Sequence, residues 1–487
     1  MTDSSAGRVI VVGGGIAGLV TAYRLLQVAN GRGVDVAVFE ASTELGGKIR
    51  TGRLKGFPIE DGPDSFVVRK PWALELCREL GLDRDVVAPA PGGVYVWIRG
   101  RLERFPTPAA FGVPANVEAL LRWKGLSVRG RLRALGDLIR PGAKDRRDES
   151  IMSLLDRRLG REAADTLVAP LLAGLHAGGA EQLGIAATFP ELRAWERDHG
   201  SLIRGSKAAQ RAARSRSRDG EEDPMFATVW TGLSRMTEVL TEAIGRDRVA
   251  MGEPVSALRR ESDGWVVSVG PHEILTDAVV LATPAFEAAR LLGPENPRAA
   301  NELAAIPYAS TAVVSLAFPP GTLTALPPGT GFIVPPGAGL TITACTFVSS
   351  KWPRAEHEGR AVVRCFVGRA GAEEWMELDD DALAQRAAGE VRAVTGLNRP
   401  PHDWRVARWP RSMPQYEVGH LDRLARLDRA LEGSPGAFVV GSAYRGVGIA
   451  DCVRQAGETA AVVRAYLSGR ANGPPPAARD VEEEALS

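Results

Sequence analysis

The chain has 487 residues, a formal net charge of +1 and an apolar content of 45%. This length exceeds what one hydrophobic core usually supports, so we expect two or three domains. A nearly neutral chain has no general attraction for nucleic acid. Four scattered cysteines without CxxC spacing argue against a zinc site and suit a reducing, cytoplasmic compartment. No uncharged apolar run reaches the roughly 18 residues of an integral membrane segment. Peripheral attachment through an amphipathic surface remains open.

The first predicted strand, residues 8–12, runs into a glycine-rich turn and then a helix over about residues 16–28. This order is typical of a dinucleotide-binding site. Gly13 allows the tight turn, Gly15 lets the backbone approach a pyrophosphate, and Gly18 lets the helix pack closely on its strand. The free N–H groups at the start of the helix favour phosphate. The cofactor contacts expected here are Gly13, Gly14, Gly15, Ile16, Ala17 and Gly18.

A second apolar strand, residues 34–39, ends in Glu40. The spacing of roughly 20 residues is that of an acid that holds a ribose hydroxyl. Paired glycines follow, with Lys48 placed to meet negative charge. After a short hairpin, the turn 62–65 is either a cofactor-lining turn or an ordinary surface turn, and a helix is predicted over about residues 71–80. The expected cofactor contacts here are Glu40, Ala41, Gly47, Lys48, Gly62, Pro63, Asp64 and Ser65.

A strand pair, residues 94–98 and 101–105, precedes a helical region that extends to about residue 210. Within it, residues 127–139 alternate arginines with apolar residues at helical spacing, which predicts an amphipathic surface helix. Its exposed face is either simply solvated or a membrane or partner face. The small-residue segment 171–179 contains His176, which is either a substrate contact or a structural histidine.

Residues 207–223 have few large apolar side chains and dense charge, so we expect an exposed flexible loop between domain segments. Interleaved aromatic residues are lacking and an acidic block follows at once, which argues against a nucleic-acid-binding arm.

Strand signals return at residues 226–231 and in a predicted hairpin meander over residues 249–269, where Val255 is a candidate cofactor contact. Residues 277–284 predict a buried parallel strand, which returns the chain to the first domain. A block of antiparallel strands with a helix over about residues 380–394 is then expected to carry the substrate-facing sheet. Its strands are predicted at residues 312–318, 331–334, 341–348 and 361–367.

Residues 437–453 repeat the opening pattern of strand, glycine-rich turn and helix, the helix extending to about residue 467. A nicotinamide cofactor needs one such binding site. A flavin needs contacts from several segments of the chain to hold both its adenosine and its ring. The helix start at Val447, Gly448 and Ile449 could stabilise the negative charge of a reduced flavin. Flavin hydride transfer is therefore the predicted chemistry.

The sequence resembles the flavin monoamine oxidase-like superfamily and, within it, the HemY-type porphyrinogen oxidases, over nearly the whole chain. Segments 342–346, 351–353 and 367–371 are similar to the water-soluble branch that oxidises coproporphyrinogen III. The other motifs that carry the resemblance are Gly13–Gly18, Glu40-Ala-Ser, Leu45-Gly-Gly-Lys48, Gly62–Phe66, Ala187–Pro190, Ser412–Tyr416, Val418-Gly-His420 and Gly446–Ile449.

The resemblance implies that FAD takes electrons from a porphyrinogen in three two-electron steps, with oxygen reoxidising the flavin and hydrogen peroxide released. It adds Trp409 to the expected cofactor contacts and assigns no catalytic base. Where the protoporphyrinogen branch has a propionate-binding arginine, this chain has Val94, so Arg69 and Lys70 are considered instead, with an ordinary solvent-exposed role as the alternative. The expected substrate contacts are Lys70, His176, Phe332 and Thr343.

The expected fold class is α/β with α+β character: a Rossmann-like FAD-binding domain, an antiparallel-sheet substrate domain and a helical subdomain. The rival functions are a protoporphyrinogen IX oxidase, another flavin amine oxidase or desaturase, and a redox-silent flavin-binding protein. The expected segments are 1–90, 224–295 and 406–470 for FAD binding, 91–210 for the helical subdomain with part of the substrate domain, 211–223 for a flexible charged loop, 296–405 for the substrate domain and 471–487 for a disordered tail.

Overall fold

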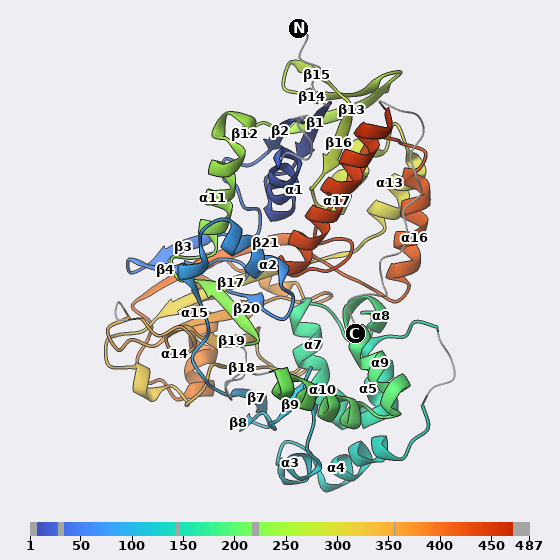
Figure 1. Cartoon of the computed structure of the whole chain (residues 1–487). Coiled ribbons are helices and arrows are strands. Elements are labelled where there is room, and N and C mark those ends of the chain that lie inside the picture. Colours follow the sequence, from blue (N-terminus) through green and yellow to red (C-terminus); the bar gives the residue numbers. More distant parts are fainter. Residues whose placement is uncertain (1–6, 28–33, 143–146, 217–223, 355–356, 471–487) are drawn as a thin grey trace.

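The computed structural model describes residues 7–27, 34–142, 147–216, 224–354 and 357–470. Figure 1 shows a parallel sheet with its helices at the top, a second sheet at the lower left and a cluster of helices at the lower right. The expected class, α/β with α+β character, is confirmed. The predicted tail and the end of the predicted charged loop lie outside the described residues.

Five parallel strands form the sheet of the upper region, in the order β12-β2-β1-β16-β22. β1 and β16 are buried runs of apolar residues, as expected for parallel strands covered on both faces. Chain segments from the beginning, the middle and the end of the sequence therefore meet in one sheet. Its strands are β1 (Arg8–Val12), β2 (Asp35–Glu40), β12 (Val249–Met251), β16 (Ala278–Leu281) and β22 (Ala437–Val439).

One face of this sheet packs against α1 (Ile16–Leu26), α11 (Ser234–Ile244) and α17 (Ile449–Arg470) in a single apolar core. The opposite face packs in a second core against a three-stranded meander and three helices. These elements are β13 (Val255–Glu261), β14 (Gly264–Val269), β15 (His272–Thr276), α12 (Ala285–Leu292), α13 (Pro297–Ala304) and α16 (His420–Leu431).

Two expectations about this region need correction. β12 lies in the parallel sheet beside β2 and is not the first strand of a meander over residues 249–269. The expected domain boundary at residue 296 also falls too early, because α13 packs in the core of the parallel sheet through Ala299 and Leu303.

The second sheet has seven strands in the order β21-β17-β20-β19-β18-β7-β8, all antiparallel pairs except β18 with β7. α15 (Asp380–Thr395) packs on one face. The expected boundary at residue 406 falls inside β21, which pairs with β17 along its length, so the second sheet extends to residue 414. The strands are β7 (Val94–Ile98), β8 (Arg101–Arg104), β17 (Tyr308–Ala317), β18 (Gly331–Ile333), β19 (Ile342–Phe347), β20 (Val362–Val367) and β21 (Asp403–Pro414).

Several short elements pack around the two sheets. The predicted hairpin before the 62–65 turn and the helix after it are both present. These elements are β3 (Thr51–Leu54), β4 (Phe57–Glu60), β5 (Phe66–Val67), α2 (Trp72–Glu79), β6 (Val86–Val87), β11 (Phe226–Val229) and α14 (Val348–Lys351).

The helical region surrounds its own apolar core, with a short hairpin at its edge. A buried ion pair joins its parts: Arg158 Nε lies 2.6 Å from Asp137, and both side chains are almost fully buried. The elements are β9 (Ala109–Ala110), β10 (Val113–Pro114), α3 (Val117–Arg122), α4 (Val128–Leu135), α5 (Ile151–Leu159), α6 (Arg161–Ala163), α7 (Ala169–Leu175), α8 (Ile185–Thr188), α9 (Pro190–His199) and α10 (Leu202–Arg216).

The prediction of a loop over residues 207–223 is wrong for its first half, because α10 extends to Arg216. The helix is anchored on the hairpin beside it: Ser206 Oγ donates to the carbonyl oxygen of Val113, and Gln210 Nε2 donates to that of Ala109. Residues 211–215 are exposed, as predicted, but they continue the helix. Residues 217–223 lie outside the described ranges.

The amphipathic helix predicted in residues 127–139 is present as α4. Val128 and Leu132 are exposed by 67% and 62%, while Gly130 and Ala134 face the core. None of the helices in the described part of the chain combines the length and apolar character that crossing a bilayer requires.

Candidate functional site

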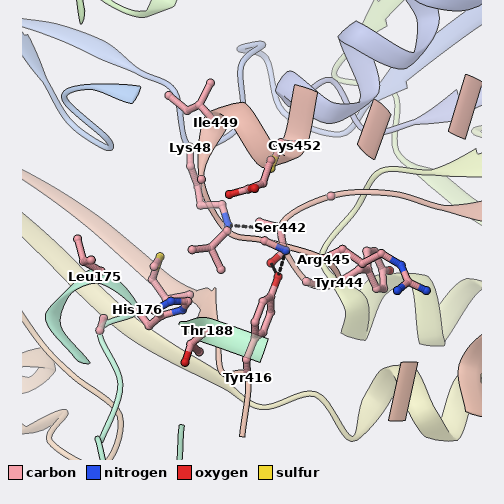
Figure 2. A pocket seen from close by; sticks show the side chains of 18 of the residues that line it. Lys48, Leu175, His176, Thr188, Tyr416, Ser442, Tyr444, Arg445, Ile449 and Cys452 are labelled. Atoms are coloured by element: carbon pink, nitrogen blue, oxygen red, sulfur yellow. Dashed lines mark hydrogen bonds between the residues drawn. The ribbon is translucent and has the colours of Figure 1, made fainter. Parts of the chain in front are cut away.

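A cavity of about 4110 Å³ runs from the carboxyl end of the parallel sheet to the space between the second sheet and α7. Chain segments from all three regions line it. Figure 2 shows part of it, with Lys48 and Tyr416 pointing toward Ser442 and His176 at the side. All predicted cofactor residues line this cavity except Gly14 and Gly18, which pack behind its wall.

The glycine turn after β1 brings strand and helix into close contact. Gly13 has a φ of +112°, which favours glycine, and a Cβ there would lie 2.9 Å from the carbonyl oxygen of Ala282. A Cβ on Gly18 would lie only 2.0 Å from the carbonyl oxygen of Gly13. The close packing expected at Gly18 is therefore present, and Gly14 and Gly18 shape the turn from behind.

The second glycine pair, Gly46 and Gly47, lies against the glycine turn that follows β1. The backbone N–H of Gly46 donates to the carbonyl oxygen of Gly14 at 2.8 Å. A Cβ on Gly15 would meet only the Cα of Gly47, at 3.9 Å. The free backbone surface beside the N-terminus of α1 is thus open to the cavity, and it fits a pyrophosphate.

Glu40 lies at the end of β2 and lines the cavity. Its two carboxylate oxygens accept hydrogen bonds from the backbone N–H groups of Gly14, at 2.6 Å, and Ser42, at 2.8 Å. These bonds fix the carboxylate beside the glycine turn. Each oxygen keeps a further lone pair for a hydroxyl donor.

Lys48 reaches from the second glycine pair to the C-terminal part of the chain. Its Nζ donates to the carbonyl oxygen of Ser412 at 2.7 Å and to Ser442 Oγ at 2.9 Å (Figure 2). Burial lowers the pKa of this ammonium below its ordinary value, since neither partner is charged. Lys48 therefore joins two cavity-lining segments that are far apart in sequence.

The 62–65 turn lines the cavity and is not an ordinary surface turn. Lys351 Nζ lies 2.9 Å from Asp64, and Arg364 donates to the carbonyl oxygen of Gly62 at 2.5 Å. Burial alone would raise the pKa of Asp64, but the charges of Lys351 and Arg364 hold it well below its usual range. Trp409 Nε1 donates to the carbonyl oxygen of Asp61 at 2.7 Å. Sequence reasoning missed Lys351 and Arg364 in this role.

Glu60, just before this turn, gives a pH-dependent contribution to stability. Burial raises its pKa from 4.5 to about 7, although Leu233 N–H and Thr51 Oγ1 donate to it. The folded chain therefore holds this proton more tightly than the unfolded chain, so stability falls as pH rises from about 4.5 through about 7.

We expect Glu60→Gln, which is neutral at every pH, to remove this fall. Between about pH 5 and about pH 8, the free energy of unfolding of the wild type should drop by roughly 1–3 kcal/mol more than that of the variant. Urea unfolding at both pH values measures the difference, with the exposed Glu253→Gln as the matched control. Parallel pH profiles for wild type and Glu60→Gln would contradict the assignment.

The start of α17 forms another part of the wall. Tyr416 OH donates to the carbonyl oxygen of Ser442 at 2.7 Å and accepts from the N–H of Gly446 at 2.9 Å. Val447, Gly448 and Ile449 all line the cavity, with the N-terminus of the helix beside it. Tyr416 lies in a motif that the sequence singled out, but its part in holding this turn was not predicted.

Three of the four predicted substrate contacts line the cavity. Lys70 does so, but its Nζ forms an ion pair with both oxygens of Asp451, at 2.7 and 2.8 Å. Thr343 lines the cavity and donates to the carbonyl oxygen of Phe366. Burial, with the charges of Lys70 and His420, lowers the pKa of His176 to about 4, so its imidazole is neutral at neutral pH.

The prediction that Phe332 touches substrate is wrong. Its ring is 1% exposed and packs 6.0 Å from that of Phe347 in the core under α15. Successive residues of a strand point to opposite faces, so the neighbouring Ile333 lines the cavity instead.

Residues 16–464 match the model of the family described as flavin containing amine oxidoreductase. The chain is 33% identical to coproporphyrinogen III oxidase of Bacillus subtilis, over 94% of this chain and 98% of that protein. It is 34% identical to the enzyme of the same name from Propionibacterium freudenreichii, over 97% and 94% of the two chains.

A crystal structure from Exiguobacterium sp., described as a candidate protoporphyrinogen oxidase, superimposes with a TM-score of 0.84 at 30% identity, over 94% of this chain and 99% of that one. The family match and these similarities extend across all three regions of the fold. The chain therefore belongs to the family of flavin-containing amine oxidoreductases.

Proposed function

We propose that this protein is an FAD-dependent oxidase that converts coproporphyrinogen III to coproporphyrin III, with oxygen as the electron acceptor. The relatives from Bacillus subtilis and Propionibacterium freudenreichii bear that name and match it over more than nine-tenths of both chains. The observation that carries the proposal is the single cavity, which joins a dinucleotide cradle to a second compartment beside His176 and has room for a cofactor and a macrocycle.

The proposed cofactor site uses the N-terminus of α1 for the pyrophosphate and Glu40 for a ribose hydroxyl. Gly14 and Gly18 do not line the cavity, and their role is to keep the glycine turn tight. The residues proposed to contact FAD are Gly13, Gly15, Ile16, Ala17, Glu40, Ala41, Gly47, Lys48, Gly62, Pro63, Asp64, Ser65, Val255, Trp409, Val447, Gly448 and Ile449.

When bound, the flavin would supply an acceptor for two electrons, which are transferred as hydride from a carbon atom. Oxygen can reoxidise that acceptor. The positive end of the α17 dipole lies at Val447 to Ile449. It stabilises negative charge in the adjacent part of the cavity. The ion pairs of Asp64 hold the 62–65 turn rigid. No side chain is proposed as a base, since burial lowers the pKa of His176 to about 4, which makes its imidazole a weak proton acceptor at neutral pH.

Converting the porphyrinogen to the porphyrin removes six electrons and six hydrogens, so three molecules of oxygen become three of hydrogen peroxide. We expect the purified protein to form about three peroxides for each fluorescent porphyrin. Porphyrin fluorescence and a peroxide assay measure both products, with free FAD at the same concentration as the control for spontaneous oxidation. Porphyrin formation no faster than in that control would contradict the proposal.

The strongest alternative is protoporphyrinogen IX oxidation, which is favoured by the name of the related Exiguobacterium protein.

We also propose a cytoplasmic location. Cys345 and Cys365 face each other on adjacent strands with their sulfurs 4.0 Å apart, and both are free thiols. A pair so placed suits a reducing compartment. Fractionation of cells that express the protein would test this location, and recovery outside the cytoplasm would contradict it.

A further inference from the structure

We propose that Arg369 binds a propionate carboxylate of the substrate. The inference rests on the proposed function, because it assigns one specificity-determining contact within the same cavity. Arg369 lines that cavity.

Among the described residues of the cavity wall, Arg369 is the basic residue whose side chain has no hydrogen-bond, ion-pair or aromatic partner. Lys70 is paired with Asp451, and Lys48 donates to two neutral oxygens. Four other arginines of the wall, Arg161, Arg290, Arg445 and Arg454, form ion pairs with acidic side chains.

Two further arginines of the wall lie over aromatic rings. Arg69 lies 5.8 Å from the ring centre of Phe111, and Arg411 lies 3.9 Å from that of Phe286. Within the described ranges, the guanidinium of Arg369 has neither a carboxylate partner nor an aromatic ring beneath it. Of the candidates named from the sequence, Lys70 is paired with Asp451 and Arg69 lies over the ring of Phe111.

The backbone around Arg369 is fixed where the second sheet meets the helical region. Gly368 and Gly371 have φ values of +90° and +77°, which favour glycine. The N–H of Ala370 donates to the carbonyl oxygen of Ala177 at 2.9 Å, next to His176. The guanidinium therefore starts from a preorganised loop beside the proposed substrate compartment.

The electrostatics of this position favour an anionic ligand. Burial lowers the pKa of Arg369, and no charge in the described part of the chain opposes that effect. Arginine nevertheless stays protonated at neutral pH, so a partly desolvated cation faces the cavity without a counter-charge. A carboxylate that binds its fork of N–H groups removes that cost and is held in a defined orientation.

The test compares Arg369→Gln and Arg369→Lys with Arg386→Gln, which removes an exposed arginine from α15 outside the cavity. The ligands are coproporphyrin III, which carries four carboxylates, and its uncharged tetramethyl ester, both titrated by fluorescence. We expect Arg369→Gln to raise the Kd of the acid at least about 10-fold and to leave that of the ester unchanged. Arg369→Lys should give a smaller loss, and Arg386→Gln none.

An unchanged Kd for the acid, equal weakening for acid and ester, or loss of bound FAD from Arg369→Gln would each overturn the assignment. Steady-state kinetics should show the same change as a raised KM for coproporphyrinogen III. The two proposals fail differently: a wild type that oxidises no porphyrinogen contradicts the proposed function, whereas a wild type and an Arg369→Gln variant with equal KM contradict only the role of Arg369.

Discussion

Replacing Gly18 by Ala is expected to raise the Kd for FAD at least about 100-fold, because the new methyl group would force strand and helix apart. Its Cβ would lie 2.0 Å from the carbonyl oxygen of Gly13, which is backbone and cannot move aside without opening the turn. The N–H groups at the start of α1 would then lose their alignment on the pyrophosphate. Flavin absorbance after purification and a fluorescence titration with FAD measure the loss.

Gly457→Ala is the matched control, since it is also a glycine within a helix but its Cβ would meet nothing within 4 Å. This control should retain FAD fully and gain up to about 1 kcal/mol of stability. Circular dichroism of Gly18→Ala separates loss of the cofactor from loss of the fold. A folded Gly18→Ala that binds FAD as tightly as the wild type would contradict the part given to this glycine.

Replacing Arg158 by Met is expected to lower the free energy of unfolding by about 3–5 kcal/mol, because it leaves Asp137 buried without its counter-charge. Asp137 is fully buried, and it accepts hydrogen bonds from Arg158 Nε at 2.6 Å, Ser201 Oγ at 2.5 Å and the N–H of Ile203 at 2.9 Å. The remaining two donors are neutral and do not balance the carboxylate. Urea unfolding followed by circular dichroism gives the change.

Arg122→Met is the matched control, because it breaks an exposed ion pair with Glu118 in the same helical region. Exposed pairs of this kind contribute at most about 1 kcal/mol. Adding Asp137→Asn to Arg158→Met should recover part of the lost stability, since it removes the unpaired charge. Equal stability losses in Arg158→Met and Arg122→Met would contradict the importance assigned to the buried pair.

The cradle could be predicted because each of its parts is local in sequence. A strand, a glycine turn, a helix and an acid at the end of the next strand lie within residues 8–40, and each pattern has a direct physical cause. The strands of the second sheet were also largely predicted, from alternation and β-branched runs. Such patterns do not indicate which face of a strand lines the cavity. For this reason Phe332 was wrongly predicted to contact substrate.

Contacts between distant segments could not be predicted from local patterns. The ion pair of Lys70 with Asp451 joins residues 381 positions apart, and nothing near Lys70 in the sequence indicates it. The network of Asp64, Lys351 and Arg364 likewise spans two regions of the fold. In α10, composition suggested a loop, but hydrogen bonds from Ser206 and Gln210 to the hairpin β9–β10 anchor the helix.

Steady-state kinetics of the purified, FAD-loaded protein on coproporphyrinogen III and protoporphyrinogen IX, under identical conditions, test the central claim most directly. The first substrate has four propionates, and the second replaces two of them with vinyl groups. A cavity wall that carries a cation without a counter-charge favours the substrate with more carboxylates, and kcat/KM reports this discrimination. A kcat/KM at least about 10-fold higher for coproporphyrinogen III is the predicted result, and a clearly higher value for protoporphyrinogen IX would contradict it.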